Sequence, residues 1–208
     1  MLVSFKVPFL CSRSLAPHLA SVFSGEYDVP IFASDLTILD LGANVGAFSV
    51  WAAHRWPGSR VFAYEPLREN VAEFEFNVAR AGLGGKITLH DWAIGTPGLR
   101  PLFTGKNNSG EGSLFATCGG VADVGYHVEV RDPLTMPEAD IIKIDTEGCE
   151  IEILEPLVRA GRRFSAVLLE YHSSAHRRAL DSLLPDYSLT KAEVFSENRG
   201  VLCYVRKS

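Results

Sequence analysis

Short apolar runs alternate with segments of helical periodicity along the first half of the chain. Residues 37–41, 60–64 and 86–90 are rich in aliphatic, aromatic or β-branched side chains, which predicts three strands. Between these runs, residues 45–56 and 68–81 place apolar side chains at roughly helical spacing. This strand–helix–strand–helix–strand order predicts a parallel sheet that is covered by helices on both faces.

The alternation stops near residue 94 and resumes near residue 141. Glycine, proline, asparagine and serine are dense in residues 95–120, which predicts turns and a mobile loop there, and residues 104–120 are expected to act as a lid. A strand is expected at residues 126–130, where the chain leaves this insertion. The regular pattern then predicts two more strand–helix pairs, at 141–144 with 149–160 and at 166–169 with 174–184.

Two final runs, at residues 188–195 and 201–206, are separated by a turn at Glu197-Asn-Arg-Gly200 and predict an antiparallel hairpin at the edge of the sheet. The expected fold is therefore a single Rossmann-like α/β domain with a mostly parallel seven-stranded sheet. This domain is expected to cover residues 35–208, with a Gly-rich insertion near 95–125, and residues 1–34 are expected to form a short helical segment.

Composition narrows the possible partners. The chain has 208 residues, of which 47% are hydrophobic and 22% charged, and its net charge is −5. A nucleic-acid partner held by its phosphates is therefore disfavoured. We find no apolar run long enough to span a membrane. The four cysteines form no CxxC pair, which indicates reduced thiols and a cytoplasmic protein rather than a zinc site or a disulfide framework.

The strongest chemical signal is a glycine turn between a strand and a helix. Asp40 lies in that strand, and Gly42 and Gly46 follow with the spacing G-x-x-x-G, which is shorter than the G-x-G-x-x-G typical of a pyrophosphate site. A second acid, Glu65, ends the next strand, where its carboxylate can accept hydrogen bonds from both ribose hydroxyls. A cofactor that has a ribose but no pyrophosphate fits this set better than NAD does.

The third predicted strand is followed by Asp91 and Trp92. In a sheet of this kind these residues are expected to border the adenine pocket. The carboxylate could accept from the exocyclic amine, and the indole could cover the ring. Packing in the protein core is the alternative role for Trp92.

Three motifs together resemble the FkbM-type methyltransferases. They are Asp40-Leu-Gly-Ala-Asn44-Val-Gly46, Ala63-Tyr-Glu-Pro66 and Ile142-Lys-Ile-Asp-Thr-Glu-Gly-Cys-Glu150. The resemblance covers about residues 35–172 and implies a class I methyltransferase fold with S-adenosylmethionine as methyl donor. It also implies a hydroxyl acceptor on a sugar or another small molecule. The residues expected to bind the cofactor are Asp40, Gly42, Asn44, Gly46, Glu65, Pro66, Asp91, Trp92 and Asp145.

Candidate catalytic groups lie at the ends of the fourth and fifth predicted strands. Asp145 ends the fourth strand, and Glu170 and His172 follow the fifth with a spacing of two, so both can point to one side. Methyl transfer to oxygen needs a group that takes the proton of the acceptor, and an imidazole suits that role near neutral pH. A divalent metal held by Asp145, Glu170 and His172 is an alternative that we favour less than metal-free chemistry.

Other functions stay open at this point. An N-directed or nucleic-acid methyltransferase is disfavoured because Asp145-Thr-Glu-Gly148 stands where adenine N-methylating enzymes usually carry an Asn/Asp-Pro-Pro-aromatic run. A non-catalytic module that keeps the cofactor pocket as a scaffold is the remaining alternative. The acids that follow both later strands favour an enzyme.

Overall fold

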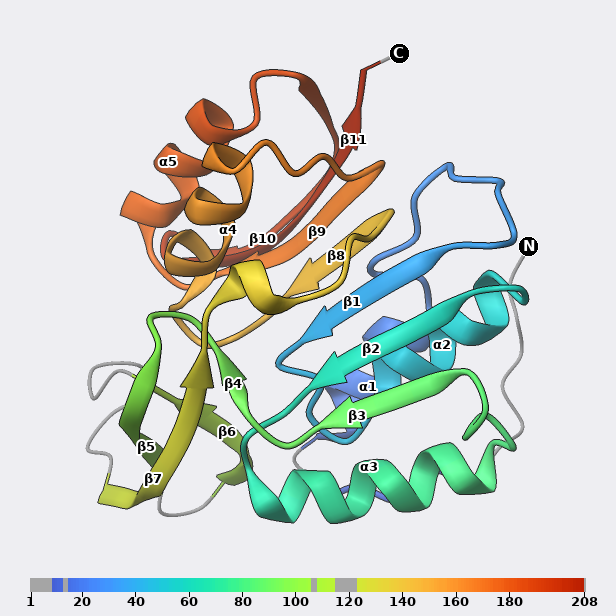
Figure 1. Ribbon diagram of the computed structural model, residues 1–208, viewed down its shortest axis with the longest axis vertical. Coiled ribbons are helices and arrows are strands. Elements are labelled where there is room, and N and C mark those ends of the chain that lie inside the picture. The colour runs from blue at the N-terminus through green and yellow to red at the C-terminus, as the bar shows by residue number, and fades with distance from the viewer. Residues whose placement is uncertain (1–8, 13–14, 106–107, 115–122, 208) are drawn as a thin grey trace.

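Seven strands form the main sheet of the computed structural model, which describes residues 9–12, 15–105, 108–114 and 123–207. The strands are β1 (Thr37–Leu41), β2 (Arg60–Tyr64), β3 (Ile87–His90), β8 (Ile141–Ile144), β9 (Ala166–Tyr171), β10 (Tyr187–Ser196) and β11 (Arg199–Arg206). Their order across the sheet is β10-β11-β9-β8-β1-β2-β3 (Figure 1). Strands β3, β2, β1, β8 and β9 pair in parallel, whereas β11 is antiparallel to both of its neighbours. The predicted Rossmann-like sheet and its C-terminal hairpin are confirmed.

Helices cover both faces of this sheet because its central strands are buried on both sides. Beneath one face lie α2 (Ala47–Arg55) and α3 (Arg68–Arg80), whose buried Phe48 and Phe74 share a cluster with Ile38 of β1. On the other face α4 (Glu150–Arg159) and α5 (Ser174–Leu183) form a second cluster with Leu39. Each predicted helix matches one of these four, with ends that differ by a residue or two.

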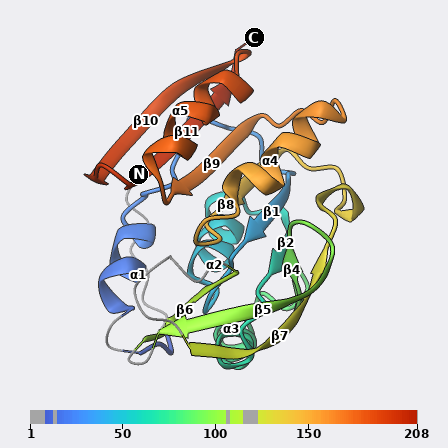
Figure 2. The ribbon, with the colours of Figure 1, turned by 90° about the vertical axis from the view of Figure 1, so that its left-hand side faces the viewer.

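The described residues between 95 and 114 form strands where a mobile loop was predicted. A second sheet forms there from β4 (Ala93–Ile94), β5 (Gly98–Gly105), β6 (Asn108–Ser113) and β7 (Asp123–Arg131), in the order β4-β7-β5-β6. It stands beyond the carboxyl ends of the parallel strands (Figures 1 and 2). Backbone pairing between β5 and β7 does not need an apolar sequence, so composition alone missed these strands. Much of the predicted lid at 104–120 lies outside the described residues, and the lid stays a prediction.

The N-terminal part of the described chain contains a helix, α1 (Ala16–Phe23), within the segment where one was expected. Leu15 and Leu19 form a small buried cluster with Val45, which lies in the glycine turn. The indole N–H of Trp56 also donates to the carbonyl of Ile31. These contacts place α1 and the chain that follows it against the same face as α2.

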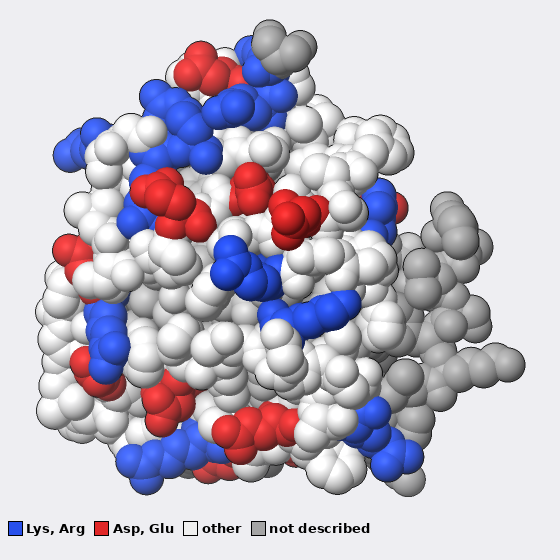
Figure 3. Space-filling model, turned by 45° about the vertical axis from the view of Figure 1, so that its right-hand side comes forward, with Lys and Arg blue, Asp and Glu red and all other residues white. Residues whose placement is uncertain are grey.

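The surface carries mixed charge where it is drawn in Figure 3. Lysine and arginine side chains alternate there with aspartate and glutamate, and no broad basic stripe crosses the described residues on this face. Among the residues that the structure describes, no helix is both long enough and apolar enough to cross a membrane.

A buried ion pair joins the two central strands. Asp40 of β1 and Lys143 of β8 are partners in the parallel register, and Lys143 Nζ lies 3.2 Å from Asp40 Oδ1. The hydroxyl of Ser49 donates to the other carboxylate oxygen of Asp40 at 2.6 Å. Burial alone lowers the pKa of Lys143, but the charges of Asp40 and Asp145 outweigh it and raise that pKa, so the side chain stays an ammonium.

We predict that Lys143→Met lowers the free energy of unfolding by about 3–5 kcal/mol, because Asp40 would be left as an uncompensated buried charge. Chemical denaturation measures this loss, and Lys86→Met at an exposed lysine is the control. The double variant Asp40→Asn/Lys143→Met should lose less free energy of unfolding than the sum of the losses in Asp40→Asn and in Lys143→Met. A single-variant cost below about 1 kcal/mol, the range of exposed pairs, would contradict the prediction.

Candidate functional site

The glycine turn after β1 has a backbone that only particular residues can adopt. Gly42 has a φ of 70°, and a Cβ atom there would lie 1.8 Å from the backbone oxygen of Asp145. Asn44 is also left-handed, with a φ of 49°. Gly46, with a φ of 89°, caps α2, and a Cβ there would meet the ring of Phe74 at 2.9 Å. The turn therefore lies close against the strand end that carries Asp145.

Glu65 ends β2 and is held by the turn. Its carboxylate accepts from the backbone N–H of Asn44 at 2.8 Å and from that of Leu67 at 2.9 Å, and a hydrogen bond to the Asn70 side chain adds to these. The side chain is buried. Burial raises the pKa of Glu65 to about 7, although these hydrogen bonds and the charge of Lys143 act in the opposite direction.

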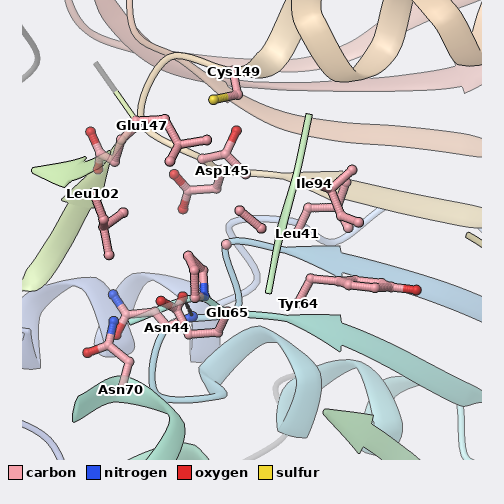
Figure 4. A pocket seen from close by; sticks show the side chains of 15 residues that line it. Leu41, Asn44, Tyr64, Glu65, Asn70, Ile94, Leu102, Asp145, Glu147 and Cys149 are labelled. Atoms are coloured by element: carbon pink, nitrogen blue, oxygen red, sulfur yellow. Dashed lines mark hydrogen bonds between the residues drawn. The ribbon is translucent and has the colours of Figure 1, made fainter. Parts of the chain in front are cut away.

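A cavity opens beside this carboxylate, and we call it the Glu65 cavity (Figure 4). Its empty volume is about 640 Å³, which includes space open to solvent. The two sheets line it together, with Leu41, Gly42, Asn44, Tyr64, Glu65, Pro66, Asn70, Ala93, Ile94, Leu102, Leu114, Asp145, Thr146, Glu147 and Cys149. It combines one buried carboxylate with apolar walls from β4 and β5.

The structure separates the predicted cofactor residues into two groups. The first group lines the Glu65 cavity and consists of Gly42, Asn44, Glu65, Pro66 and Asp145. The other four do not line it: they are Asp40, Gly46, Asp91 and Trp92. Asp40 and Gly46 lie next to the cavity lining. Asp40 is fully buried and pairs with Lys143, and Gly46 is the N-cap of α2.

Asp91 and Trp92, the expected adenine contacts, do not line the Glu65 cavity. The exposed Asp91 lines a separate hollow beside β7. The ring of Trp92 lies against that of His90, with centroids 4.5 Å apart, and the guanidinium of Arg131 sits 3.6 Å from its centre. β4 begins directly after Trp92, and its residues Ala93 and Ile94 line the Glu65 cavity.

A second cavity lies on the other side of the glycine turn, and we call it the Arg199 cavity. Its empty volume is about 590 Å³, and it shares Gly42, Asn44, Asp145 and Glu147 with the Glu65 cavity. Its remaining lining is Leu15, His18, Leu19, Ala43, Val45, Ala47, Phe48, Lys143, Glu170 and Arg199. The two cavities therefore meet at the turn that follows β8.

His172 lies between carboxylates at this junction. Its Nδ1 lies 2.8 Å from Glu150 Oε1, and its Nε2 lies 3.2 Å from Glu147 Oε2 and 3.6 Å from Glu170 Oε1. Burial alone lowers the pKa of His172, but the hydrogen bond to Glu150 and the charges of Glu147, Glu150 and Asp145 raise it to about 9. The ring of the ligand-free protein is then protonated at neutral pH, which disfavours the predicted role as general base.

Glu170 has a different partner. The guanidinium Nε of Arg199, at the start of β11, donates to Glu170 Oε1 in a very short contact. Arg199 also lies 4.0 Å from Glu147 Oε1. The strand after the final turn therefore adds a cation to the site. Sequence reasoning missed Arg199 because the turn Glu197-Asn-Arg-Gly200 indicated a hairpin and nothing else.

A sequence model of the "Methyltransferase FkbM domain" family matches residues 40–190, which is most of the chain. The chain belongs to the FkbM methyltransferase family. The matched region contains the glycine turn, Glu65 and the run from Lys143 to Glu150, so the resemblance expected from these motifs is confirmed.

Several relatives of this FkbM methyltransferase are methyltransferases by name. The chain is 23% identical to Methyltransferase sdnD of Sordaria araneosa over 77% of its own length and 76% of that protein. It is 25% identical to the hexuronic acid methyltransferase AglP of Haloferax volcanii, over 79% and 67% of the two chains. It spans only 27% of Methyltransferase 1 of Beauveria bassiana, with 30% identity over 69 residues.

Among solved structures, the chain is similar to the methyltransferase FkbM from Methylobacillus flagellatus KT. The TM-score is 0.58 at 18% sequence identity, over 90% of this chain and 47% of that one. Likeness at this identity concerns the fold, and it agrees with the sheet order described above.

We predict that Glu65 of the ligand-free FkbM protein titrates near pH 7 rather than near its ordinary pKa of about 4.5. Because the folded pKa is raised, the protonated side chain is favoured in the folded state, and ionisation costs stability as the pH rises from about 4.5 through 7. Carboxyl-carbon NMR of labelled glutamate, assigned with Glu65→Gln, measures the midpoint. A midpoint near 4.5 would show that water reaches the carboxylate freely.

Proposed function

We propose that this methyltransferase transfers a methyl group from S-adenosylmethionine to a hydroxyl oxygen of a carbohydrate or another small molecule. One observation carries the proposal: two cavities meet at Asp145, one beside a buried carboxylate suited to a ribose and the other lined by charged side chains. Membership of the FkbM family and the hexuronic acid methyltransferase among the relatives support it.

The Glu65 cavity has the chemistry that the cofactor needs. Glu65 would accept a hydrogen bond from a ribose hydroxyl, since a carboxylate has about four acceptor positions and the N–H groups of Asn44, Leu67 and the Asn70 side chain use three of them. Ile94 and Leu102 offer apolar surface for the adenine ring. When bound, the cofactor would supply a methyl group on a positively charged sulfur. Gly42, Asn44 and Asp145 would place that end where the two cavities join.

The Arg199 cavity is the proposed acceptor site. Its charged lining, with Lys143, Glu170 and Arg199 beside Asp145, suits hydroxyl groups that both donate and accept hydrogen bonds. That pattern fits a sugar or polyol better than an apolar alcohol. The relative that acts on a hexuronic acid makes a carbohydrate the first acceptor class to test.

Asp145 is the proposed proton acceptor. Its carboxylate lines both cavities, whereas Glu170 is paired with Arg199 and His172 is protonated in the ligand-free protein. Asp145 would orient the acceptor hydroxyl in line with the methyl group. It would take the proton of that hydroxyl as the oxygen bonds to the methyl carbon and the carbon–sulfur bond breaks.

The cofactor site gives a prediction on affinity. Glu65→Ala should weaken binding of S-adenosylhomocysteine by about 1.5–3 kcal/mol, because a charge-assisted hydrogen bond is lost. The wild-type affinity should also fall as the pH drops below about 7, where Glu65 becomes protonated in the free protein. Titration calorimetry measures both effects, and Glu69→Ala on the exposed first turn of α3 is the control. An unchanged affinity in Glu65→Ala would mean that the ribose is held elsewhere.

The reaction gives a second prediction. Asp145→Asn should lower the turnover number by roughly 10²–10⁴-fold, the range for loss of a general base. The assay follows S-adenosylhomocysteine formation with a panel of sugars, uronic acids and polyols. Asp91→Asn, outside both cavities, should retain normal turnover. Normal turnover in Asp145→Asn would remove this residue from proton transfer, and the absence of transfer to any hydroxyl compound would argue against O-methylation.

A further inference from the structure

The side chain of His172 offers a buried nitrogen atom to a group of carboxylates. Its side chain is only 7% exposed, and Nε2 makes no hydrogen bond. This atom lies 3.2 Å from Glu147 Oε2, and a ring nitrogen of His172 forms a group with one oxygen each of Asp145 and Glu147 in which all three atoms are within 4.8 Å of one another. A buried donor or acceptor without a hydrogen bond is costly, and a cation that replaced the Nε2 proton would bind this nitrogen and the neighbouring Glu147 oxygen, 3.2 Å away, together.

The opposite ring nitrogen is held in the way that metal-binding histidines usually are. Nδ1 contacts Oε1 of Glu150, a fully buried carboxylate. Glu150 is itself fixed by the backbone N–H of Gly148 and by the ring of His176, at 2.9 Å and 2.8 Å. A carboxylate behind a histidine sets the tautomer and the ring orientation, so that the other nitrogen can bind a cation.

Glu147, which belongs to the same group, has a left-handed backbone conformation. Glu147 has a φ of 52°, and among the described residues only Asn44 is another non-glycine with positive φ. The hydroxyl of Ser113, at the end of β6, donates to the carbonyl of Glu147 at 2.8 Å and helps to hold this conformation. Strain of this kind persists where the surrounding structure fixes it, and it is typical of functional positions.

We propose that Asp145, Glu147 and His172 form a divalent cation site at the junction of the two cavities, with Mn²⁺ as the cation that fits best. Two carboxylates suit Mg²⁺ or Mn²⁺, and the imidazole shifts the preference toward Mn²⁺. An octahedral cation with ligands at about 2.1 Å places neighbouring ligand atoms about 3 Å apart and opposite ones about 4 Å apart, so small side-chain shifts complete the site.

This ligand set differs from the one expected from sequence. Glu170 was expected beside Asp145 and His172, but its Oε1 accepts from Arg199, so the charge of Glu170 is already compensated. Glu147 takes its place. Asp145 and Glu147 are each about one-quarter exposed and line the Arg199 cavity, which leaves room for water or an acceptor oxygen in the remaining positions.

The cation site adds a role for metal to the proposed function, but it can be tested separately from that function. One oxygen of Asp145 would bind the cation, and the other would face the acceptor hydroxyl. A cation there would lower the pKa of a hydroxyl bound to it and so assist its deprotonation. Cation binding can be measured without cofactor or acceptor, and cofactor binding can be measured in the presence of a chelator.

The experiment uses Mn²⁺ alone with the full chain. Electron paramagnetic resonance of free Mn²⁺ should show one bound ion per chain, and pulsed measurements on the bound ion should show coupling to a ¹⁴N nucleus from the imidazole. His172→Gln should abolish that coupling, and Glu147→Gln should weaken Mn²⁺ binding at least tenfold. Glu150→Gln, which leaves the three ligands in place, should weaken it by about 10–100-fold.

His127→Gln and Glu155→Gln, both outside the cluster, are the matched controls and should bind Mn²⁺ normally. Circular dichroism identifies any variant that fails to fold. If His172→Gln fails to fold, Glu147→Gln still tests the site, because Glu147 lies in a partly exposed turn. No bound Mn²⁺ up to millimolar concentration, bound Mn²⁺ without ¹⁴N coupling, or equal binding in wild type and Glu147→Gln would each overturn the site. If S-adenosylhomocysteine still binds with chelator present, the proposed function survives that result.

Discussion

The ammonium group of Lys143 connects the centre of the sheet to both cavities. It pairs with Asp40 across the β1–β8 register, donates to the carbonyl of Gly42 at 2.8 Å and lies 3.6 Å from Asp145 Oδ2. A charge pair removed from water is retained only if its remaining hydrogen-bonding groups find partners, and the glycine turn supplies one of them. The strand pairing, the shape of the turn and the position of Asp145 thus depend on a single side chain.

The main sheet could be predicted because buried parallel strands leave continuous apolar runs in the sequence, as Thr37–Leu41 and Ile141–Ile144 do. The second sheet could not. Its strand β5 reads GLRPLFTG, and only part of it is apolar, because one face of a small sheet is enough to cover the cavity. Leu102 is buried there while Leu99 is 73% exposed, and this contrast depends on the fold around them.

Some residues of the candidate site could likewise be predicted from the sequence, and others could not. Local motifs pointed to Gly42, Asn44, Glu65 and Asp145 because each sits at a strand end or in a turn whose geometry follows from nearby sequence. The motifs could not show that Asp91 lines the hollow beside β7 and not the Glu65 cavity, since that depends on how the second sheet packs. Nor could they show the contacts of Glu150 with His172 and His176, which join residues 22 and 26 positions apart. Glu150 begins α4, where the helix dipole favours a carboxylate whatever its distant partners are.

The position of β11 has a consequence for how the protein is made. β10 is synthesised before β11, yet β11 lies between β10 and β9 in the sheet. While the chain emerges from the ribosome, β9 therefore keeps an unpaired edge, and β10 has no neighbour to join. Arg199, the first residue of β11, reaches Glu170 only after this last insertion. The contact between Arg199 and Glu170 is thus among the last of the described contacts to form. A nascent chain that stalls before β11 would expose the unpaired edge of β9 to other chains and to chaperones.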